Sequence, residues 1–187
     1  MLIQFIGPGG AGKTTIAKQL APKIGAVCID LDEYFLKMEG DISLYIQQHG
    51  YLAYARRNIT LYQQLRRSIQ PEQSVILVCS SGFMTYALDQ DAEYKTIKHQ
   101  LLAEAQTYVF LPSLDKKQCI DLIVQRQLNR AYLQADPEKE CLKISQRFDQ
   151  YASFACTRVI THDTPENIVN FLMTLLAAPK GLNKGVL

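Results

Sequence analysis

The sequence predicts an α/β fold in which helices cover both faces of a parallel sheet. Apolar runs of four or five residues alternate along the chain with longer segments of helical periodicity, the order expected of strand–helix–strand units. The runs are rich in Val, Ile, Leu and Tyr, as strands buried on both faces are. Ligands of such sheets bind beyond the carboxyl ends of the strands, so the residues that follow each strand are the candidates for function.

Five strands and seven helices account for most of the chain. The predicted strands are 2–6, Val27–Asp30, Val75–Cys79, Tyr108–Leu111 and Thr157–Thr161. The predicted helices lie near 13–24, 41–48, 51–69, 91–104, 115–128, 138–154 and 165–177. The last helix has the clearest start, because Thr164 stands at its N-cap and Pro165 at its first position. Residues 1–177 are therefore expected to form a single domain, and 178–187, with one Pro and two Gly, a flexible tail.

A glycine-rich segment joins the first strand to the first helix, and it matches the P-loop pattern G-x-x-x-x-G-K-[ST]. Glycine has no Cβ and adopts positive φ, so the backbone can wrap closely around phosphate oxygens. Successive N–H groups and the helix N-terminus then point at the anion. The predicted nucleotide contacts are Gly9, Gly10, Ala11, Gly12, Lys13, Thr14 and Thr15.

Two side chains of the motif carry its chemistry. Lys13 is expected to face solvent in the empty loop and to reach the β- and γ-phosphates of ATP. The hydroxyl of Thr14 is predicted to ligate Mg²⁺. A glycine-rich turn with no ligand is the alternative, and eight matched positions between strand and helix make it a weak one.

Composition excludes several classes of protein. The chain has 187 residues, 48% of them apolar and 20% charged, which is ordinary for one globular domain. A net charge of +2 without long basic runs argues against a nucleic-acid partner. The five cysteines are odd in number and never occur as C-x-x-C, so neither disulfides nor a zinc site are expected. No signal peptide, membrane span or oligomer is implied, and the predicted location is cytoplasmic.

The second strand ends in Asp30-Leu31-Asp32. Residues two apart in a strand point to the same face of the sheet, so both carboxylates are expected on one face, near the edge where ligands bind. Asp30 is predicted to lie in the outer shell of Mg²⁺. Asp32 is predicted to accept a hydrogen bond or proton from a substrate hydroxyl. The alternative is that Asp32 caps a following helix at Glu33–Leu36 and that Asp30 is merely solvated.

The third strand ends in Ser80-Ser81-Gly82. Small residues there let a ligand approach the backbone, with Gly82 the most constrained; a plain turn is the alternative.

The helical segment 51–69 carries Arg56 and Arg57. One of them is predicted to pair with an anionic substrate, because a guanidinium group binds a carboxylate through two parallel hydrogen bonds. Two solvated arginines are the alternative.

Apolar periodicity stops after Leu128 and the segment ends at Pro137, which predicts a mobile lid over about 129–137. Arg126 and Arg130 flank or lie in it, and Arg147 follows on the next helix. Such arginines neutralise charge on a transferring phosphoryl group. Surface charge is the alternative for all three.

Together these motifs resemble the shikimate kinase family, among the nucleoside-monophosphate-kinase-like P-loop kinases. The resemblance covers about residues 1–176, in the order P-loop, Asp30/Asp32, the Gly40…Gly50…Arg56 spacing, the small-residue turn, Arg130 and Arg147…Tyr151. It implies a three-layer P-loop NTPase fold with sheet order 2-3-1-4-5. It also implies that shikimate binds through Asp32, Arg56, Gly82 and Arg147. Arg130 would then act on the phosphoryl group, and Arg126 would flank adenine.

The chain departs from the family in its substrate half. Ser80 and Ser81 stand where members usually show glycine, and the glutamate expected shortly after Arg56 has no counterpart. We therefore expect an ATP-dependent kinase that phosphorylates a hydroxyl of a small anionic metabolite, with shikimate as first candidate. Another polyol, a sugar acid such as gluconate or a nucleoside remains open as acceptor, as does a nucleotide-binding module without catalysis.

Overall fold

The computed structural model describes residues 1–88, 91–128 and 137–177. Its centre is a five-stranded parallel sheet of order β2-β3-β1-β4-β5, as the family resemblance implied. The strands are β1 (Leu2–Ile6), β2 (Val27–Asp30), β3 (Val75–Val78), β4 (Thr107–Leu111) and β5 (Thr157–Ile160). Each lies within one residue of the bounds predicted from the sequence.

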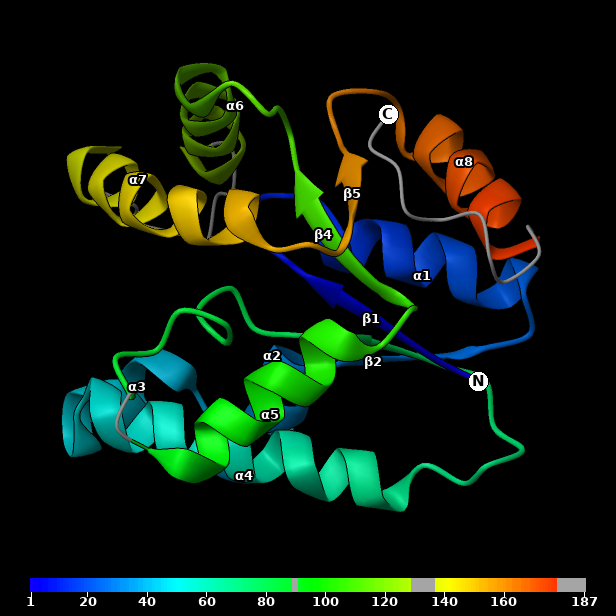
Figure 1. The fold of residues 1–187 in the computed structure, drawn as a ribbon. Helices are drawn as coiled ribbons and strands as arrows, with labels where there is room; N and C mark the ends of the chain where they lie inside the picture. Colours follow the sequence, from blue (N-terminus) through cyan, green and yellow to red (C-terminus); the bar gives the residue numbers. More distant parts are fainter. Residues whose placement is uncertain (89–90, 129–136, 178–187) are drawn as a thin grey trace.

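Helices cover both faces of the sheet (Figure 1). They are α1 (Lys13–Lys23), α2 (Leu31–Glu39), α3 (Ile42–His49), α4 (Tyr51–Ser68), α5 (Ala92–Ala103), α6 (Lys116–Leu128), α7 (Pro137–Ser153) and α8 (Pro165–Ala177). Seven match the predicted helices. The eighth, α2, appeared in the sequence reading only as the alternative at Glu33–Leu36.

Side chains of alternate residues in each central strand pack into two separate hydrophobic cores, one on each face of the sheet. Ile3 and Phe5 of β1 pack with α1 and α8, whereas Ile6 packs in the cluster of α2, α4, α5 and α7. β4 divides in the same way, with Phe110 on the first side and Leu111 on the second. This two-sided burial explains why the strands read as continuous apolar runs.

The strand register brings the predicted site residues to one edge. Phe5 pairs with Val78, and Val78 pairs with Asp30, so β1, β3 and β2 end at the same level. The P-loop, the turn after β3 and the start of α2 all follow these ends. Within the described ranges, no helix is long and apolar enough to cross a membrane.

Candidate active site

The loop between β1 and α1 has a backbone that its glycines permit. Gly7, Gly10 and Gly12 have φ values of 145°, 77° and 89°, which residues with side chains rarely adopt. A Cβ on Gly7 would lie 2.4 Å from the carbonyl oxygen of Phe110. Gly12 is the N-cap of α1 and offers no capping side chain. The first N–H groups of the helix therefore remain available to an anion.

Lys13 is buried, so the expectation of a solvent-facing lysine is wrong. The residue is 7% exposed. Its ammonium group donates hydrogen bonds to the carbonyl oxygens of Gly7 (2.7 Å) and Pro8 (3.0 Å). These two bonds fold the side chain back over the P-loop. Burial lowers the pKa of Lys13 to about 8, although the carboxylates of Asp32 and Asp30 act to raise it.

Asp30 connects the end of β2 to both α1 and α2. Its Oδ2 accepts from Thr14 Oγ1 at 2.6 Å, and its Oδ1 accepts from the backbone N–H groups of Asp32 (2.9 Å) and Glu33 (3.4 Å). Asp30 is thus the N-cap of α2. The alternative in which Asp32 caps this helix and Asp30 is merely solvated is wrong.

The hydroxyl of Thr14 and the carboxylate of Asp30 suit Mg²⁺. This ion prefers oxygen ligands and is usually held by one or two protein groups together with phosphates and water. The two side-chain oxygens lie 2.6 Å apart at the end of the P-loop. In the part of the chain that the structure describes, no group of three or more His, Cys, Asp or Glu could hold a metal ion by itself. The donor set therefore fits a cation that arrives with its nucleotide.

Asp32 presents a carboxylate oxygen with no partner. Its Oδ1 is buried and makes no hydrogen bond. Burial raises the pKa of this carboxyl, while hydrogen bonds from the hydroxyls of Ser80 and Tyr54 and the charge of Lys13 lower it. A buried acceptor without a donor costs free energy, so a donor on a bound ligand would be stabilising there.

Arg147 of α7 reaches the turn after β3. Its Nη1 donates to Oγ of Ser81 (3.3 Å) and its Nη2 to the hydroxyl of Tyr51 (3.2 Å). A Cβ on Gly82 would lie 2.8 Å from that hydroxyl and 3.1 Å from Nη2 of Arg147. The charge of Arg147 also lowers the pKa of Lys13, by less than burial does.

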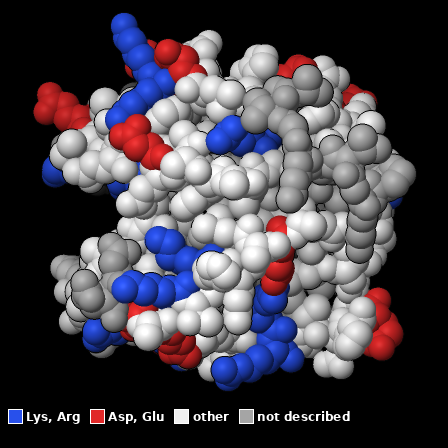
Figure 2. All heavy atoms as spheres, viewed as in Figure 1, with Lys and Arg blue, Asp and Glu red and all other residues white. Residues whose placement is uncertain are grey.

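The surface near this site is notched between α7 and the α3–α4 pair, and Lys and Arg side chains gather at the notch (Figure 2). A concave surface of one charge sign attracts ligands of the opposite sign. The shape and charge therefore favour an anionic substrate.

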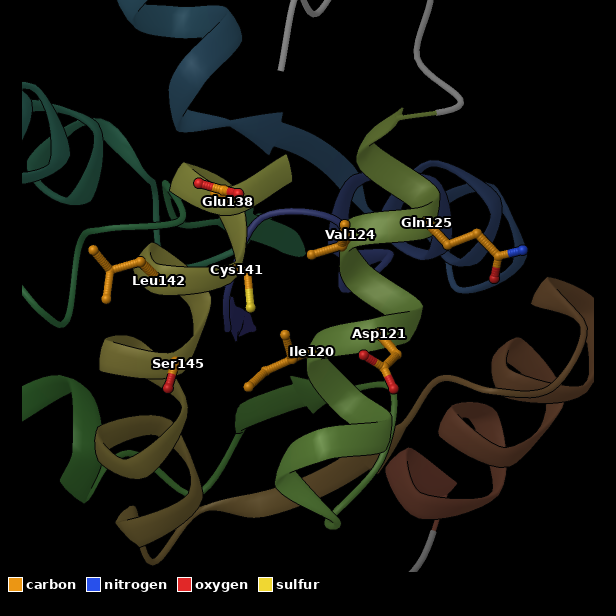
Figure 3. Close-up of a pocket in the computed structure, with 8 residues that line it drawn as sticks. All are labelled: Ile120, Asp121, Val124, Gln125, Glu138, Cys141, Leu142 and Ser145. Carbon is orange, nitrogen blue, oxygen red and sulfur yellow. The ribbon is translucent and has the colours of Figure 1, made fainter. Parts of the chain in front are cut away.

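A second cavity, of about 730 Å³, lies between α6 and α7. Ile120, Val124 and Cys141 point into the space between these helices (Figure 3). Among the described residues, its lining includes none of the predicted site residues, so this part of the cavity is distinct from the P-loop site.

Residues 9–177 match the sequence profile of the family described as shikimate kinase. The chain belongs to the shikimate kinase family. A relative named shikimate kinase, from Francisella philomiragia subsp. philomiragia, is 29% identical over 178 residues, which are 93% of each chain. The protein is accordingly a phosphotransferase with an alcohol acceptor that uses ATP.

Solved structures of shikimate kinases have the same fold. The enzyme from Acinetobacter baumannii, solved in complex with shikimate, gives a TM-score of 0.72 at 21% identity, over 94% of this chain and 92% of that one. The enzyme from Bacteroides thetaiotaomicron gives 0.71 at 19% identity, over 95% and 99%. At these identities the likeness establishes the fold.

The two arginines of α4 differ in their surroundings. Arg57 is paired with Glu39, whose Oε1 accepts from Nε (2.9 Å) and Nη2 (2.5 Å). Arg56 is exposed, and none of the described contacts joins it to Arg147 or Asp32. A family role for Arg56 at a shared acceptor pocket therefore stays a prediction.

Arg126 links the end of α6 to the nucleotide loop. Its Nη1 donates to the carbonyl oxygen of Gly10 and to Oγ1 of Thr161, both at 3.3 Å, and its Nη2 donates to the carbonyl oxygen of Thr161. This position beside the P-loop is compatible with the role at adenine that the family implies. Arg130, residues 129–136 of the expected lid and the tail 178–187 lie outside the described residues.

Two residues at the site were missed by sequence reasoning. Gln127 is 7% exposed, and a Cβ on Gly9 would lie 2.8 Å from its Nε2, so it packs against the P-loop. Asn58 is fully buried on α4. The sequence signal for Asn58 was a polar residue within an apolar helical stripe, whereas no sequence signal pointed to Gln127.

Of the other predicted P-loop contacts, Ala11 is buried and Thr15 is exposed.

Proposed function

We propose that the protein transfers the γ-phosphoryl group of ATP to a hydroxyl group of shikimate. The observation that carries the proposal is the buried, unpartnered Oδ1 of Asp32 at a site where Lys13 and Arg147 supply positive charge. An acceptor hydroxyl would complete the hydrogen bonding of Asp32. The carboxylate of the same molecule would pair with Arg147. A related kinase of known structure binds shikimate, which supports this choice of acceptor.

The P-loop side of the site would hold the donor. The ammonium group of Lys13 would exchange its bonds to loop carbonyls for bonds to the β- and γ-phosphates. Thr14, with Asp30 behind it, would hold Mg²⁺, which when bound neutralises charge on the phosphates. Arg126 would flank adenine, and Arg130 from a lid over 129–137 would stabilise charge on the transferring group.

On the acceptor side, Asp32 would orient the substrate hydroxyl and take its proton as the new O–P bond forms and the bond to the leaving ADP breaks. Phosphoryl transfer depends mainly on such positioning and on charge stabilisation. Arg147 and Arg56 would hold the carboxylate, with Gly82 leaving room for the ring.

We also propose that 1–177 act as one domain, and that the five free thiols reflect a reducing, cytoplasmic location.

Turnover with Mg-ATP and a panel of acceptors tests this function. The panel holds shikimate, gluconate, a neutral polyol and a nucleoside, and ADP release is measured against wild type without acceptor. Shikimate should give the highest kcat/KM. Lys13→Met should lower kcat about 10²–10³-fold, the cost of removing one preorganised charge contact.

Different results would direct the assignment elsewhere. A preference for the polyol or the nucleoside would reject shikimate but keep the kinase. Nucleotide binding without turnover on any acceptor would favour a binding module. Near-wild-type activity in Lys13→Met would reject the assigned role of the P-loop lysine.

A further inference from the structure

Asn58 is fully buried, and its side chain contacts three hydroxyl groups. Its Nδ2 lies 2.7 Å from the hydroxyl of Tyr86, 2.8 Å from Oγ of Ser80 and 3.1 Å from the hydroxyl of Tyr54. A carboxamide nitrogen has two hydrogens and only donates, so the two shortest contacts take them. Tyr86 and Ser80 therefore accept from Asn58 and keep their own hydrogens for other partners.

Two of these three hydroxyl groups also act on Asp32. Burial raises the pKa of the Asp32 carboxyl, and hydrogen bonds with Ser80 and Tyr54 lower it. Burial also raises the pKa of Tyr54 and Tyr86, so both phenols keep their hydrogens at neutral pH. Two relays therefore connect Asn58 to Asp32, one through Ser80 and one through Tyr54.

We infer that Asn58 is a positioning residue that holds Asp32 through these two relays and so fixes its carboxylate for the acceptor hydroxyl. Nδ2 of Asn58 lies 2.8 Å from Oγ of Ser80 and 3.1 Å from the hydroxyl of Tyr54, so its side chain fixes the positions of both groups. This inference rests on the proposed function, in which Asp32 receives the substrate proton.

Ser80, through which one relay passes, lies in the turn after β3. Ser80 is 2% exposed, so its hydroxyl has little access to water.

Kinetics of three variants test the inference. Asn58→Leu removes the donor at similar volume, and Asn58→Ala removes the whole carboxamide. Tyr62→Phe is the matched control, because it removes another buried hydroxyl of α4, one that donates to Oε1 of Gln4 at 2.7 Å. Both Asn58 variants should lower kcat about 10- to 100-fold, since small misplacements of a reacting group have effects of this size. The KM for ATP should stay within about twofold, and Tyr62→Phe should keep the wild-type kcat.

A second pair of variants covers the case in which the Asn58 variants fail to fold. Ser80→Ala should lower kcat, and Ser80→Thr, which retains the hydroxyl, should restore it. If Asn58→Leu or Ser80→Ala loses thermal stability as Tyr62→Phe does but keeps kcat, the network is only structural and the inference is overturned.

A readout without catalysis separates this inference from the proposed function. If the wild type phosphorylates none of the acceptors, the proposed function fails, and hydroxyl-proton exchange measured by NMR on tyrosine-labelled protein tests the relays alone. The hydroxyl protons of Tyr54 and Tyr86 should be protected in wild type and in Tyr62→Phe but exposed in Asn58→Leu. Unchanged protection in Asn58→Leu would overturn the relays.

Discussion

Lys13 holds its positive charge in a buried place, and its neighbours act on its protonation in opposite directions. Burial lowers its pKa to about 8, while Asp32 and Asp30 favour the charged form. The bonds to two loop carbonyls partly replace its lost hydration. The buried positive charge therefore destabilises the loop without nucleotide, and bound phosphates would stabilise it. Such a loss of stability in favour of function is common at active sites.

This burial predicts a pH dependence of stability in the protein without nucleotide. The folded-state pKa, about 8, lies below the ordinary value of 10.5, so between these values the unfolded chain binds more protons than the folded one. The free energy of unfolding should then rise with pH, by at most about 1.4 kcal/mol per pH unit from this group. Urea unfolding of wild type and Lys13→Met near pH 7.5 and pH 9.5 measures the difference. Parallel pH dependences in the two proteins would contradict the shifted pKa.

Arg147 carries a second prediction at the scale of one residue. Its guanidinium group reaches Ser81 and Tyr51 beside Gly82, where an acidic acceptor would bind. Arg147→Ala should raise the KM for shikimate about tenfold to a hundredfold, because a hydrogen bond to a charged group contributes about 1.5–3 kcal/mol. The KM for ATP should change little. Arg67→Ala, an exposed arginine of α4, is the control, and equal KM values for shikimate in the two variants would reject this role.

At the scale of elements, local patterns predicted most of the architecture. Apolar runs and helical periodicity placed all five strands and seven helices, because those signals are set by burial on the sheet faces. The sequence indicates helix α2 only as an alternative, because Asp30-Leu31-Asp32 has the pattern of a strand end followed by site residues. The side chain of Asp30 in fact ends β2 and caps α2 at once. Because this one residue has both roles, no separate sequence signal marks the start of α2.

The site was predictable where a motif defines it and not where distant elements meet. The P-loop and the Asp30/Asp32 pair follow from spacing alone. The inward fold of Lys13 depends on the carbonyl positions of its own loop, and the role of Asn58 depends on hydroxyls of Ser80 and Tyr86 that follow β3. Such contacts exist only once α4 packs against that turn.

The turn after β3 has little room in front of Gly82, and this predicts the effect of one methyl group. A Cβ there would lie 2.8 Å from the Tyr51 hydroxyl, 3.0 Å from the Tyr86 ring and 3.1 Å from Arg147. The ends of Tyr51 and Arg147 can shift, so Gly82→Ala should fold but displace the groups that face the acceptor. We expect a higher KM for shikimate with the KM for ATP unchanged. A raised KM for ATP alone would place Gly82 on the nucleotide side instead.

At the scale of the whole molecule, the parallel sheet places donor and acceptor groups at one edge. β1 leads to the P-loop, β2 to Asp30 and Asp32, and β3 to the Ser80–Gly82 turn. Two cores on opposite faces fix these strand ends relative to one another. Groups from α1, α2, α4 and α7 therefore reach one site without any of them being close in sequence.

Nucleotide binding should consequently stabilise the entire fold, which gives the last prediction. A ligand at about 100 times its Kd adds about 2.7 kcal/mol to the free energy of unfolding. For a domain of this size each kcal/mol raises Tm by about 2–4 °C, so a non-hydrolysable ATP analogue with Mg²⁺ should raise Tm by about 5–11 °C. Lys13→Met should lose most of this shift, because the lysine is expected to contact the β- and γ-phosphates, whereas Tyr62→Phe should retain it. The same shift in Lys13→Met as in wild type would mean that the nucleotide binds without the P-loop lysine.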